Sequence, residues 1–274
     1  MPELPEVETT LRGIQPQVEN QIITSMVIRQ HQLRWKIPPG LAKKVQGKII
    51  NRAIRRGKYL LLLMDDASLI LHLGMSGCIR ILTQAMLPQK HDHFDIEFAN
   101  RIILRYTDPR RFGALLWTAN DPYQHPLLAK LGPEPLGSDF SAEYLWNSAK
   151  GRNTAIKSLI MNSQIVVGVG NIYAAEALFA AGIHPARAAK SLSLNHFTHL
   201  VKAIRQILQQ AIQRGGTTLK DFVNSEGKPG YFANELKVYG RGSLACVNCQ
   251  TPLSNMRIAQ RNTVYCDHCQ NISG

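Results

Sequence analysis

The sequence lacks the long apolar runs of membrane proteins. No segment approaches the roughly 20 apolar residues that a spanning helix needs, and the acidic first turn does not resemble a secretory signal. Internal repeats and low-complexity tracts are absent, and the 274 residues include only five cysteines. This cysteine usage fits a reducing compartment better than a disulfide scaffold. We therefore expect a cytoplasmic, nucleoid-associated protein with no targeting signal and no membrane partner.

Acidic side chains are scarce. The chain carries 19 Asp and Glu against 32 Lys and Arg, a net charge of +13. Between Arg34 and Lys58 there are nine basic residues and no acid. Such a surface attracts phosphate backbones and releases their counterions, so nucleic acid is the favoured partner. A run of solvated charges with no partner is the alternative for this segment.

The hydrophobic pattern predicts several domains that combine helices and strands. One helical face carries Leu4, Val7, Leu11, Ile14 and Val18. Seven short β-rich runs between residues 21 and 118 follow it and predict an antiparallel β-sandwich. A Pro- and Gly-rich passage at 131–139 predicts a hinge. Later patterns predict helices that end near 149, that span 154–161 and 194–213, and that follow GVGN.

The cysteines near the C-terminal end have metal-ligand spacing. Cys246-x2-Cys249 and Cys266-x2-Cys269 are separated by sixteen residues, a spacing typical of a four-thiolate structural zinc site without an open coordination position. The segment between the pairs predicts two strands that meet at Arg261-Asn262. A ribbon that serves only as a protein contact is the alternative, and the remaining Cys78 is expected to be a core thiol.

Pro2 and Glu3 form a candidate catalytic pair. Removal of Met1 would leave Pro2 with a free secondary amine, which titrates near roughly 8 and can attack a carbonyl or acetal carbon to give an iminium adduct. Glu3 lies beside it as a proton donor or acceptor. An ordinary helix start, with acids complementing the helix dipole, is the alternative. If Met1 stays attached, Pro2 is an amide without nucleophilicity.

Other candidates lie at turns and strand ends. Lys58 opens an apolar run, where a partly buried amine with a depressed pKa or a snorkelling lysine would fit. Gly168 and Gly170 precede a helix and suggest a phosphate site with Asn171 as a donor, although a tight helix connection explains them equally well. Three residues on turns suit a wedge into a base stack, or strand-end packing: Met75, Arg110 and Phe112. His91-Asp92-His93 suggests a phosphate contact or strand packing, because no further ligands complete a metal site.

Taken together, the motifs resemble those of the formamidopyrimidine-DNA glycosylase family. They run in unbroken order from Pro2 to Cys269: PELPEVET, RRGKYLLL, HLGMSG, DPRRFG, LGPEPL, VVGVGNIYAAEALF, GGTTLKDF, GKPGYF, VYGR and the four-cysteine finger. The resemblance implies a base-excision repair enzyme that removes 8-oxoguanine and formamidopyrimidines from double-stranded DNA. It further implies abasic-site lyase activity, with no redox or nucleotide cofactor, and we expect a monomer.

The resemblance also implies a domain order and residue roles. The expected parts are a helix with a β-sandwich (1–132), a hinge (133–140), a helix-two-turn-helix domain (141–224), a mobile loop over the extruded base (225–239) and a zinc finger (240–274). The implied roles are as follows: Pro2 as Schiff-base nucleophile, Glu3 as general acid, Lys58 and Arg261 in β- and δ-elimination, His91, Arg110, Arg152 and Asn171 as DNA contacts, and Met75, Arg110 and Phe112 as the void-filling trio. In this scheme Arg110 faces the orphaned cytosine. Departures from the family pattern, such as Leu11 where an arginine is common, do not affect the proposed chemistry.

Two rivals remain at this stage. An endonuclease VIII-like enzyme would use the same amine chemistry on oxidised pyrimidines, but that family begins PEGPE, and Leu4 together with the MSG and PRRF turns argues against it. A non-catalytic DNA-binding zinc protein would explain the charge and the cysteines, but it would have no use for the terminal proline.

Overall fold

The computed structural model describes residues 2–217 and 232–272. Its internal contacts divide the chain into two compact units, each made of two pieces. Unit 1 comprises Met1–Lys130 and Arg214–Ala233, and unit 2 comprises Leu131–Gln213 and Asn234–Gly274. Residues 225–231 of the expected base-covering loop, which include GKPGYF except for Phe232, lie outside the described residues, as does the end of the expected helical domain at 218–224.

Unit 1 begins with helix α1 (Leu4–Val18). The predicted apolar face is buried in the structure, and it packs against the neighbouring sandwich. Glu8, at the edge of this apolar face, accepts hydrogen bonds from Arg12 and from Arg55 of the sandwich, at 2.9 and 2.8 Å. Burial raises the pKa of Glu8, but hydrogen bonds and charge from Arg55 and Arg12 outweigh it and hold the pKa below its usual range. The helix is thus fixed by both apolar and ionic contacts.

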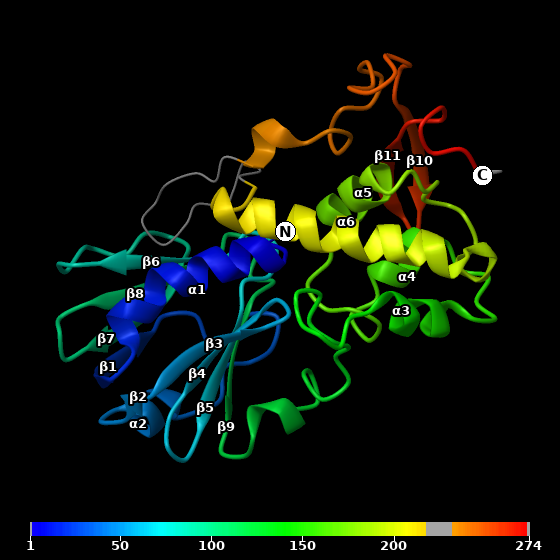
Figure 1. Ribbon diagram of the computed structural model, residues 1–274. Helices are drawn as coiled ribbons and strands as arrows, with labels where there is room; N and C mark the ends of the chain where they lie inside the picture. The colour runs from blue at the N-terminus through cyan, green and yellow to red at the C-terminus, as the bar shows by residue number, and fades with distance from the viewer. Residues whose placement is uncertain (1, 218–231, 273–274) are drawn as a thin grey trace. The chain divides into compact units, whose positions relative to one another are not determined.

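Two antiparallel sheets form the predicted sandwich (Figure 1). One has the order β2-β1-β7-β8-β6 and the other the order β3-β4-β5-β9. The strands are β1 (Gln21–Ile28), β2 (Ile49–Ile50), β3 (Arg52–Arg56), β4 (Tyr59–Leu63), β5 (Ser68–His72), β6 (Cys78–Leu82), β7 (Asp92–Phe98), β8 (Ile103–Thr107) and β9 (Ala114–Thr118), with a short helix α2 (Leu41–Val45) between β1 and β2 and a 3-10 turn η1 (Pro122–Gln124) after β9.

The strand prediction was wrong in two places. One expected strand is two, because the chain leaves one sheet at Asn51 and enters the other: β2 pairs with β1, whereas β3 pairs with β4. Strand β6 was not predicted from the sequence. It pairs with β8 at the edge of its sheet.

A buried ion network lies on the first sheet. Arg105 of β8 is only 4% exposed and donates to both carboxylate oxygens of Asp95, at 2.9 and 2.8 Å. Asp92 lies 3.6 Å from the same guanidinium and 2.7 Å from Arg80. Burial raises the pKa of Asp95, but hydrogen bonds from Arg105 and Arg29 outweigh it and lower the pKa. Arg105 also donates to the carbonyls of Met86 and Leu87, so it anchors the loop before β7.

Four helices form most of unit 2: α3 (Ala142–Ala149), α4 (Ile156–Ile160), α5 (Asn171–Ala180) and α6 (Leu194–Gln213), with a 3-10 turn η2 (Ala189–Ser191) before α6. Ser141 caps α3 by accepting from the amide of Tyr144 at 3.0 Å. Helix α6 spans the predicted range and buries its apolar face, whereas α4 is shorter than predicted.

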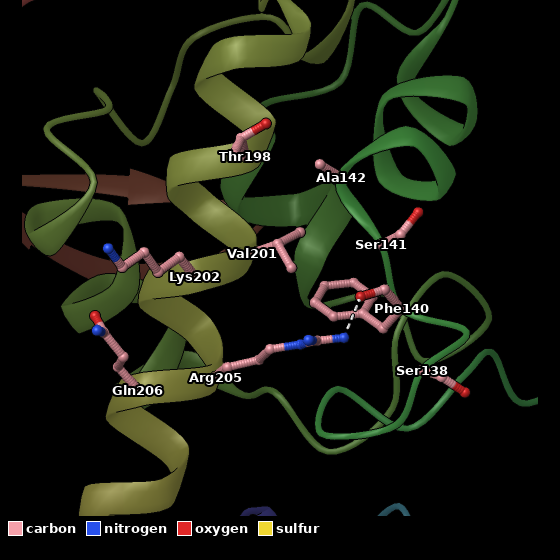
Figure 2. Close-up of a pocket in the computed structure, with 9 residues that line it drawn as sticks. All are labelled: Ser138, Phe140, Ser141, Ala142, Thr198, Val201, Lys202, Arg205 and Gln206. Carbon is pink, nitrogen blue, oxygen red and sulfur yellow. Dashed lines mark hydrogen bonds between the residues drawn. The ribbon is translucent and has the colours of Figure 1, made fainter.

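Arg205 of α6 fixes the passage before α3. Its guanidinium donates to the carbonyls of Pro135 and Gly137 and to that of Phe140, the bond drawn in Figure 2. A groove of about 440 Å³ lies beside it, lined by residues of α6, the first residue of α3 and the chain just before α3. None of the predicted site residues lines this groove, and its lining contains no acid, so we assign it no part in the chemistry.

The C-terminal part of unit 2 is a small hairpin of β10 (Ser254–Ile258) and β11 (Arg261–Tyr265), preceded by a 3-10 turn η3 (Phe232–Glu235). Residues of the hairpin pack against Ala175 and Phe179 of α5 in one apolar cluster. Glu176 of α5 accepts hydrogen bonds from the successive amides of Lys237, Val238 and Tyr239 and so holds the chain that leads to the hairpin. Among the helices that the structure describes, none combines the length and apolarity needed to cross a bilayer.

The Arg105 network gives a prediction about stability. Arg105→Met should lower the free energy of unfolding by about 3–5 kcal/mol, because it removes the most buried cation of the network and leaves Asp95 and Asp92 with only the more exposed Arg29 and Arg80. Chemical denaturation followed by circular dichroism measures the change. Lys48→Met is the matched control: it removes the partner of the exposed Asp66 and should leave stability nearly unchanged. Equal losses in both variants would contradict this account.

Candidate active site and metal centre

Pro2 and Glu3 lie directly before α1, and both are buried. Glu3 is the N-cap of the helix, and its backbone amide donates to Oε2 of Glu6 at 2.8 Å. The other oxygen of Glu6, Oε1, accepts from the amide of Thr217 at 2.8 Å. Glu6 therefore fixes the residue beside the candidate nucleophile and the chain that follows α6. Sequence reasoning missed this residue, although its position three residues after Glu3 is that of a capping box.

Lys58 lies in the two-residue turn between β3 and β4. Gly57 occupies the left-handed region, with φ of +57°, which this tight turn requires. Arg55 donates to the carbonyl of Gly57 at 3.0 Å while it also binds Glu8 of α1. The helix that follows Pro2 and Glu3 is thus tied to the hairpin that carries Lys58.

His72, at the end of β5, lies beside this hairpin. Its ring centroid is 4.8 Å from that of Tyr59, and its Nδ1 accepts from the amide of Gly74 at 3.0 Å. Burial, followed by the positive charges of Lys58 and Arg34, lowers the pKa of His72 to about 4. The imidazole is therefore neutral at physiological pH. It connects the Lys58 hairpin to the turn that carries Met75.

The three candidate wedge residues lie on two adjacent turns. Met75 and Phe112 are 38% and 42% exposed, which is unusual for large apolar side chains. The guanidinium carbon of Arg110 lies 4.9 Å from the centroid of the Phe112 ring, a cation–π distance. The amide of Arg110 donates to Oγ of Ser76, at 3.3 Å, next to Met75. The two turns therefore present one mixed apolar and cationic surface.

His91 joins this region through its backbone, because its carbonyl accepts from the amide of Asp108 at 3.1 Å. Its half-buried ring lies 6.5 Å from that of His93. Unit 1 thus connects its other five predicted residues, apart from Pro2 and Glu3: Lys58, Met75, His91, Arg110 and Phe112.

The predicted residues of unit 2 are only partly brought together. Asn171 begins α5, and its Nδ2 donates to the carbonyl of Asn262 at 3.2 Å, next to Arg261. The buried Oδ1 of Asn171 has no hydrogen-bond partner. The N-terminus of α5 therefore lies beside the hairpin tip. Arg152 is exposed in the turn after α3, and its carbonyl accepts from the amide of Lys190 at 3.0 Å. None of the contacts described for it reaches Asn171 or Arg261.

The hairpin turn is two residues earlier than predicted. Ala259 and Gln260 form it, with φ of +46° and +61°, and Arg261 is the exposed first residue of β11. Such turns favour glycine or asparagine because both central residues need positive φ. The prediction failed because neither residue type marks this turn.

The four predicted cysteines lie close enough together to hold a metal ion. Their Sγ atoms all lie within 4.8 Å of one another. Cys246 and Cys269 are 3.9 Å apart and Cys249 and Cys266 are 3.5 Å apart, distances that exclude disulfides. A tetrahedral ion with bonds of about 2.3 Å would separate its thiolates by roughly 3.8 Å, close to these values. The amides of Asn248 and Cys269 point at Sγ of Cys246 and Cys266, at 3.4 Å each, which favours thiolates.

Family models match three consecutive parts of the chain. The formamidopyrimidine-DNA glycosylase N-terminal domain matches residues 1–115, and the H2TH domain of the same enzymes matches residues 131–223. A zinc finger found in FPG and IleRS matches residues 243–272.

Similar proteins match along nearly the whole chain. A formamidopyrimidine-DNA glycosylase from Cellvibrio japonicus is 56% identical, over 98% of this chain and 100% of the relative, and one from Legionella pneumophila is 53% identical over 99% of each. The crystal structure of MutM (Fpg) from Thermus thermophilus superposes with a TM-score of 0.88 at 36% identity, covering 98% of both chains.

A Lactococcus lactis Fpg variant, solved in complex with a Fapy-dG containing DNA, gives a TM-score of 0.91 at 34% identity and covers 98% of this chain and 100% of its own. The fold, the order of the three matched domains and these identities all agree with the resemblance in the motifs. The chain belongs to the formamidopyrimidine-DNA glycosylase family, a family of DNA glycosylases with abasic-site lyase activity.

Proposed function

We propose that this protein excises oxidised purines, chiefly 8-oxoguanine and formamidopyrimidines, from double-stranded DNA and then cleaves the abasic strand. The network in unit 1 that joins α1 to the Lys58 hairpin carries the proposal. Glu6 fixes Glu3, and Glu8 and Arg55 connect the same helix to Gly57, next to Lys58. An amine, an acid and a lysine are therefore held on one rigid framework, which acid–base chemistry at a single sugar requires.

The chemistry begins at the nitrogen of Pro2 once Met1 has been removed. This nitrogen attacks C1′ of the damaged nucleotide, the bond from C1′ to the base breaks, and the base leaves with a proton. Glu3 protonates the ring oxygen, so that the sugar opens to an iminium. The iminium acidifies the C2′ hydrogens. Loss of one of them, with Lys58 transferring the proton, expels the 3′ phosphate by β-elimination.

Arg261 then assists a second elimination that expels the 5′ phosphate. The product is a gap of one nucleoside with phosphate at both ends. Proton transfers of this kind need groups fixed at hydrogen-bond distance from the reacting atoms. The exposed position of Arg261 at the hairpin tip leaves its guanidinium accessible to a phosphate.

Cations and the wedge hold the duplex while the damaged base is extruded. Extrusion costs a few kcal/mol of stacking, which new contacts offset. The exposed Met75 and Phe112 fill the space left by the base, and Arg110 faces the orphaned cytosine. His91, Arg152 and Asn171 contact the phosphate backbone. The Oδ1 of Asn171 has no partner, and its Nδ2 is bound to Asn262, so this residue contributes mainly through the amides that begin α5.

One zinc ion bound by Cys246, Cys249, Cys266 and Cys269 completes the finger. The ion supplies structure and no reaction step, because four thiolates leave no coordination position for water or substrate. Cys246 and Cys266 belong to the apolar cluster that includes Ala175 and Phe179 of α5. Metal binding is therefore coupled to the packing of the hairpin on α5.

The nucleophile is tested by borohydride trapping. Protein shown by mass spectrometry to lack Met1 should form a covalent adduct with a duplex that contains 8-oxoguanine opposite cytosine. A tag fused to the N-terminus leaves Pro2 as an amide and should abolish the adduct, whereas the same tag at the C-terminus should not. Glu3→Gln should slow formation of the trapped iminium adduct by about 10²–10⁴-fold, because ring opening loses its proton donor, and Asp66→Asn should not. Normal trapping by the N-terminally tagged protein would refute the assignment, and a preference for oxidised pyrimidines would favour the endonuclease VIII-like rival.

The metal site is tested by removing one ligand. Cys246→Ala should eliminate bound zinc, measured by elemental analysis, and should weaken binding to an abasic-analogue duplex at least about tenfold, or roughly 1.4 kcal/mol. The reason is that the hairpin loses its cross-link while unit 1 stays folded. Cys78→Ala is the matched control, because that buried thiol lies in β6 of unit 1. Unchanged affinity after zinc loss would contradict the role.

Arg110 is tested by its effect on the opposite base. Arg110→Ala should reduce the preference for 8-oxoguanine paired with cytosine over adenine by about 10–100-fold, since a good hydrogen-bonded base contact contributes roughly 1–3 kcal/mol of discrimination. Single-turnover excision rates on the two duplexes give the ratio. Lys43→Ala removes an equal charge from the exposed side of α2 and should leave the ratio intact. An unaltered ratio in Arg110→Ala would remove this residue from the role.

A further inference from the structure

Asp108 is a fully buried carboxylate that the mechanism above does not use. Its Oδ1 accepts from Oγ of Ser76 at 2.7 Å and from the amide of Arg110 at 3.2 Å. Its Oδ2 accepts from the hydroxyl of Tyr106 at 3.0 Å and from the amide of Gly113 at 2.9 Å. Among the ion pairs of the described residues none involves Asp108. Hydrogen bonds therefore compensate the burial of this carboxylate. A buried carboxylate that lacks one of its hydrogen bonds lowers the stability of the folded state.

The four donors belong to the two turns of the wedge and to the strand between them. Ser76 follows Met75, the amide of Arg110 is one of the two backbone donors, and Gly113 follows Phe112. The carboxylate therefore binds the amide of Arg110 directly. Met75 and Phe112 each precede a residue that the carboxylate binds, Ser76 and Gly113. The side chains of all three are exposed above it.

The two turns are in direct backbone contact. A Cβ added at Gly74 would lie 2.5 Å from the carbonyl carbon of Phe112, and one added at Gly113 would lie 1.7 Å from the hydroxyl oxygen of Tyr106. Only glycine permits this approach, which brings the Tyr106 hydroxyl within reach of Asp108. The carbonyl of Asp108 also accepts from Nε2 of His93 at 2.7 Å, which ties the same point to β7.

We propose that Asp108 is a positioning residue that holds Met75, Arg110 and Phe112 as one preassembled wedge. The inference rests on the proposed function, in which these side chains fill the space of an extruded base. Ordering side chains during binding costs free energy, and a rigid arrangement avoids that cost. With Asp108 in place, both turns are fixed before DNA arrives, so the discrimination by Arg110 depends on a carboxylate that touches no DNA.

Asp108→Asn tests the proposal with almost no change in shape. An amide offers one acceptor oxygen and one donor group. In one orientation its NH₂ faces the amide of Gly113, and in the other it faces the amide of Arg110. In the first case the amide of Gly113 loses its acceptor, and in the second the amide of Arg110 keeps only Oγ of Ser76. Either way the 109–113 turn loses a backbone hydrogen bond to the side chain at position 108, which releases Arg110 or Phe112 from its position.

We expect Asp108→Asn to lower the cytosine-over-adenine excision ratio at least fivefold and to reduce the fluorescence change of a 2-aminopurine placed beside the lesion. Cleavage of a single-stranded abasic oligonucleotide should stay within twofold of the unmodified protein, because no orphaned base has to be replaced there. In a Met75→Ala, Phe112→Ala background, Asp108→Asn should have little further effect on the ratio, because the wedge that it positions is already gone.

Asp95→Asn is the matched control. It changes another buried carboxylate of the same sandwich, one held by Arg105 and Arg29 instead of by the turns. It should lower the melting temperature but keep the excision ratio. If Asp108→Asn does not fold, Ser76→Ala replaces it: this variant frees only the Met75 turn from the carboxylate and should lower the ratio about twofold or more.

The outcomes separate this inference from the proposed function. A ratio that stays at the level of the unmodified protein in folded Asp108→Asn, or in Ser76→Ala if the first does not fold, overturns the positioning role. So does an equal loss of the ratio in Asp95→Asn, because the effect would then be general destabilisation. If the unmodified protein itself neither excises 8-oxoguanine nor forms the trapped adduct, the proposed function fails instead.

Discussion

The attachment of α1 to the sandwich is the constraint on which the rest of unit 1 depends. Its apolar face is buried, and Glu8 binds Arg55, which in turn binds the carbonyl of Gly57. Because the helix is a regular, hydrogen-bonded element, fixing it also fixes the residues that precede it. Pro2 and Glu3 therefore gain a defined place relative to Lys58 through the side chains of Glu8 and Arg55. Packing, cap and ion pair act together here, and loss of one of them would weaken the other two.

Much of the fold follows from local sequence patterns. The apolar stripes of α1 and α6 repeat at helical spacing over many residues, so their ranges could be predicted closely. The four cysteines could be identified as candidate ligands because the geometry of metal coordination sets their spacing in the sequence. Errors arose where a local pattern does not determine the pairing of a strand. The apolar segment that contains Asn51 leaves one sheet and enters the other. Strand β6 is recognised only by its pairing with β8. The turn at Ala259 and Gln260 was missed because neither residue belongs to the types that favour positive φ.

The candidate site was predictable to a different degree. Motifs pointed to Lys58, Arg110 and Asn171 as individual residues, but motifs do not show what holds them. The roles of Glu6 and Asp108 depend on hydrogen bonds to Thr217 and to Ser76, partners 211 and 32 residues away. The charge pattern and the periodicity of a sequence do not show which carboxylates bind backbone amides. Only the structure identifies this role. The neutral state of His72 is of the same kind, because it results from burial and from two neighbouring cations.

Neither compact unit is a continuous piece of polypeptide, and this affects how the protein can be dissected. Glu6 accepts an amide from Thr217, in the second piece of unit 1, and Glu176 holds Lys237–Tyr239, in the second piece of unit 2. During synthesis on the ribosome, more than two thirds of the chain must emerge before unit 1 has all its parts. The four-cysteine site of unit 2 is complete only after Cys269 has emerged. A fragment that ends at Lys130 would leave one oxygen of Glu6 without its amide donor, directly beneath the residues proposed to do the chemistry.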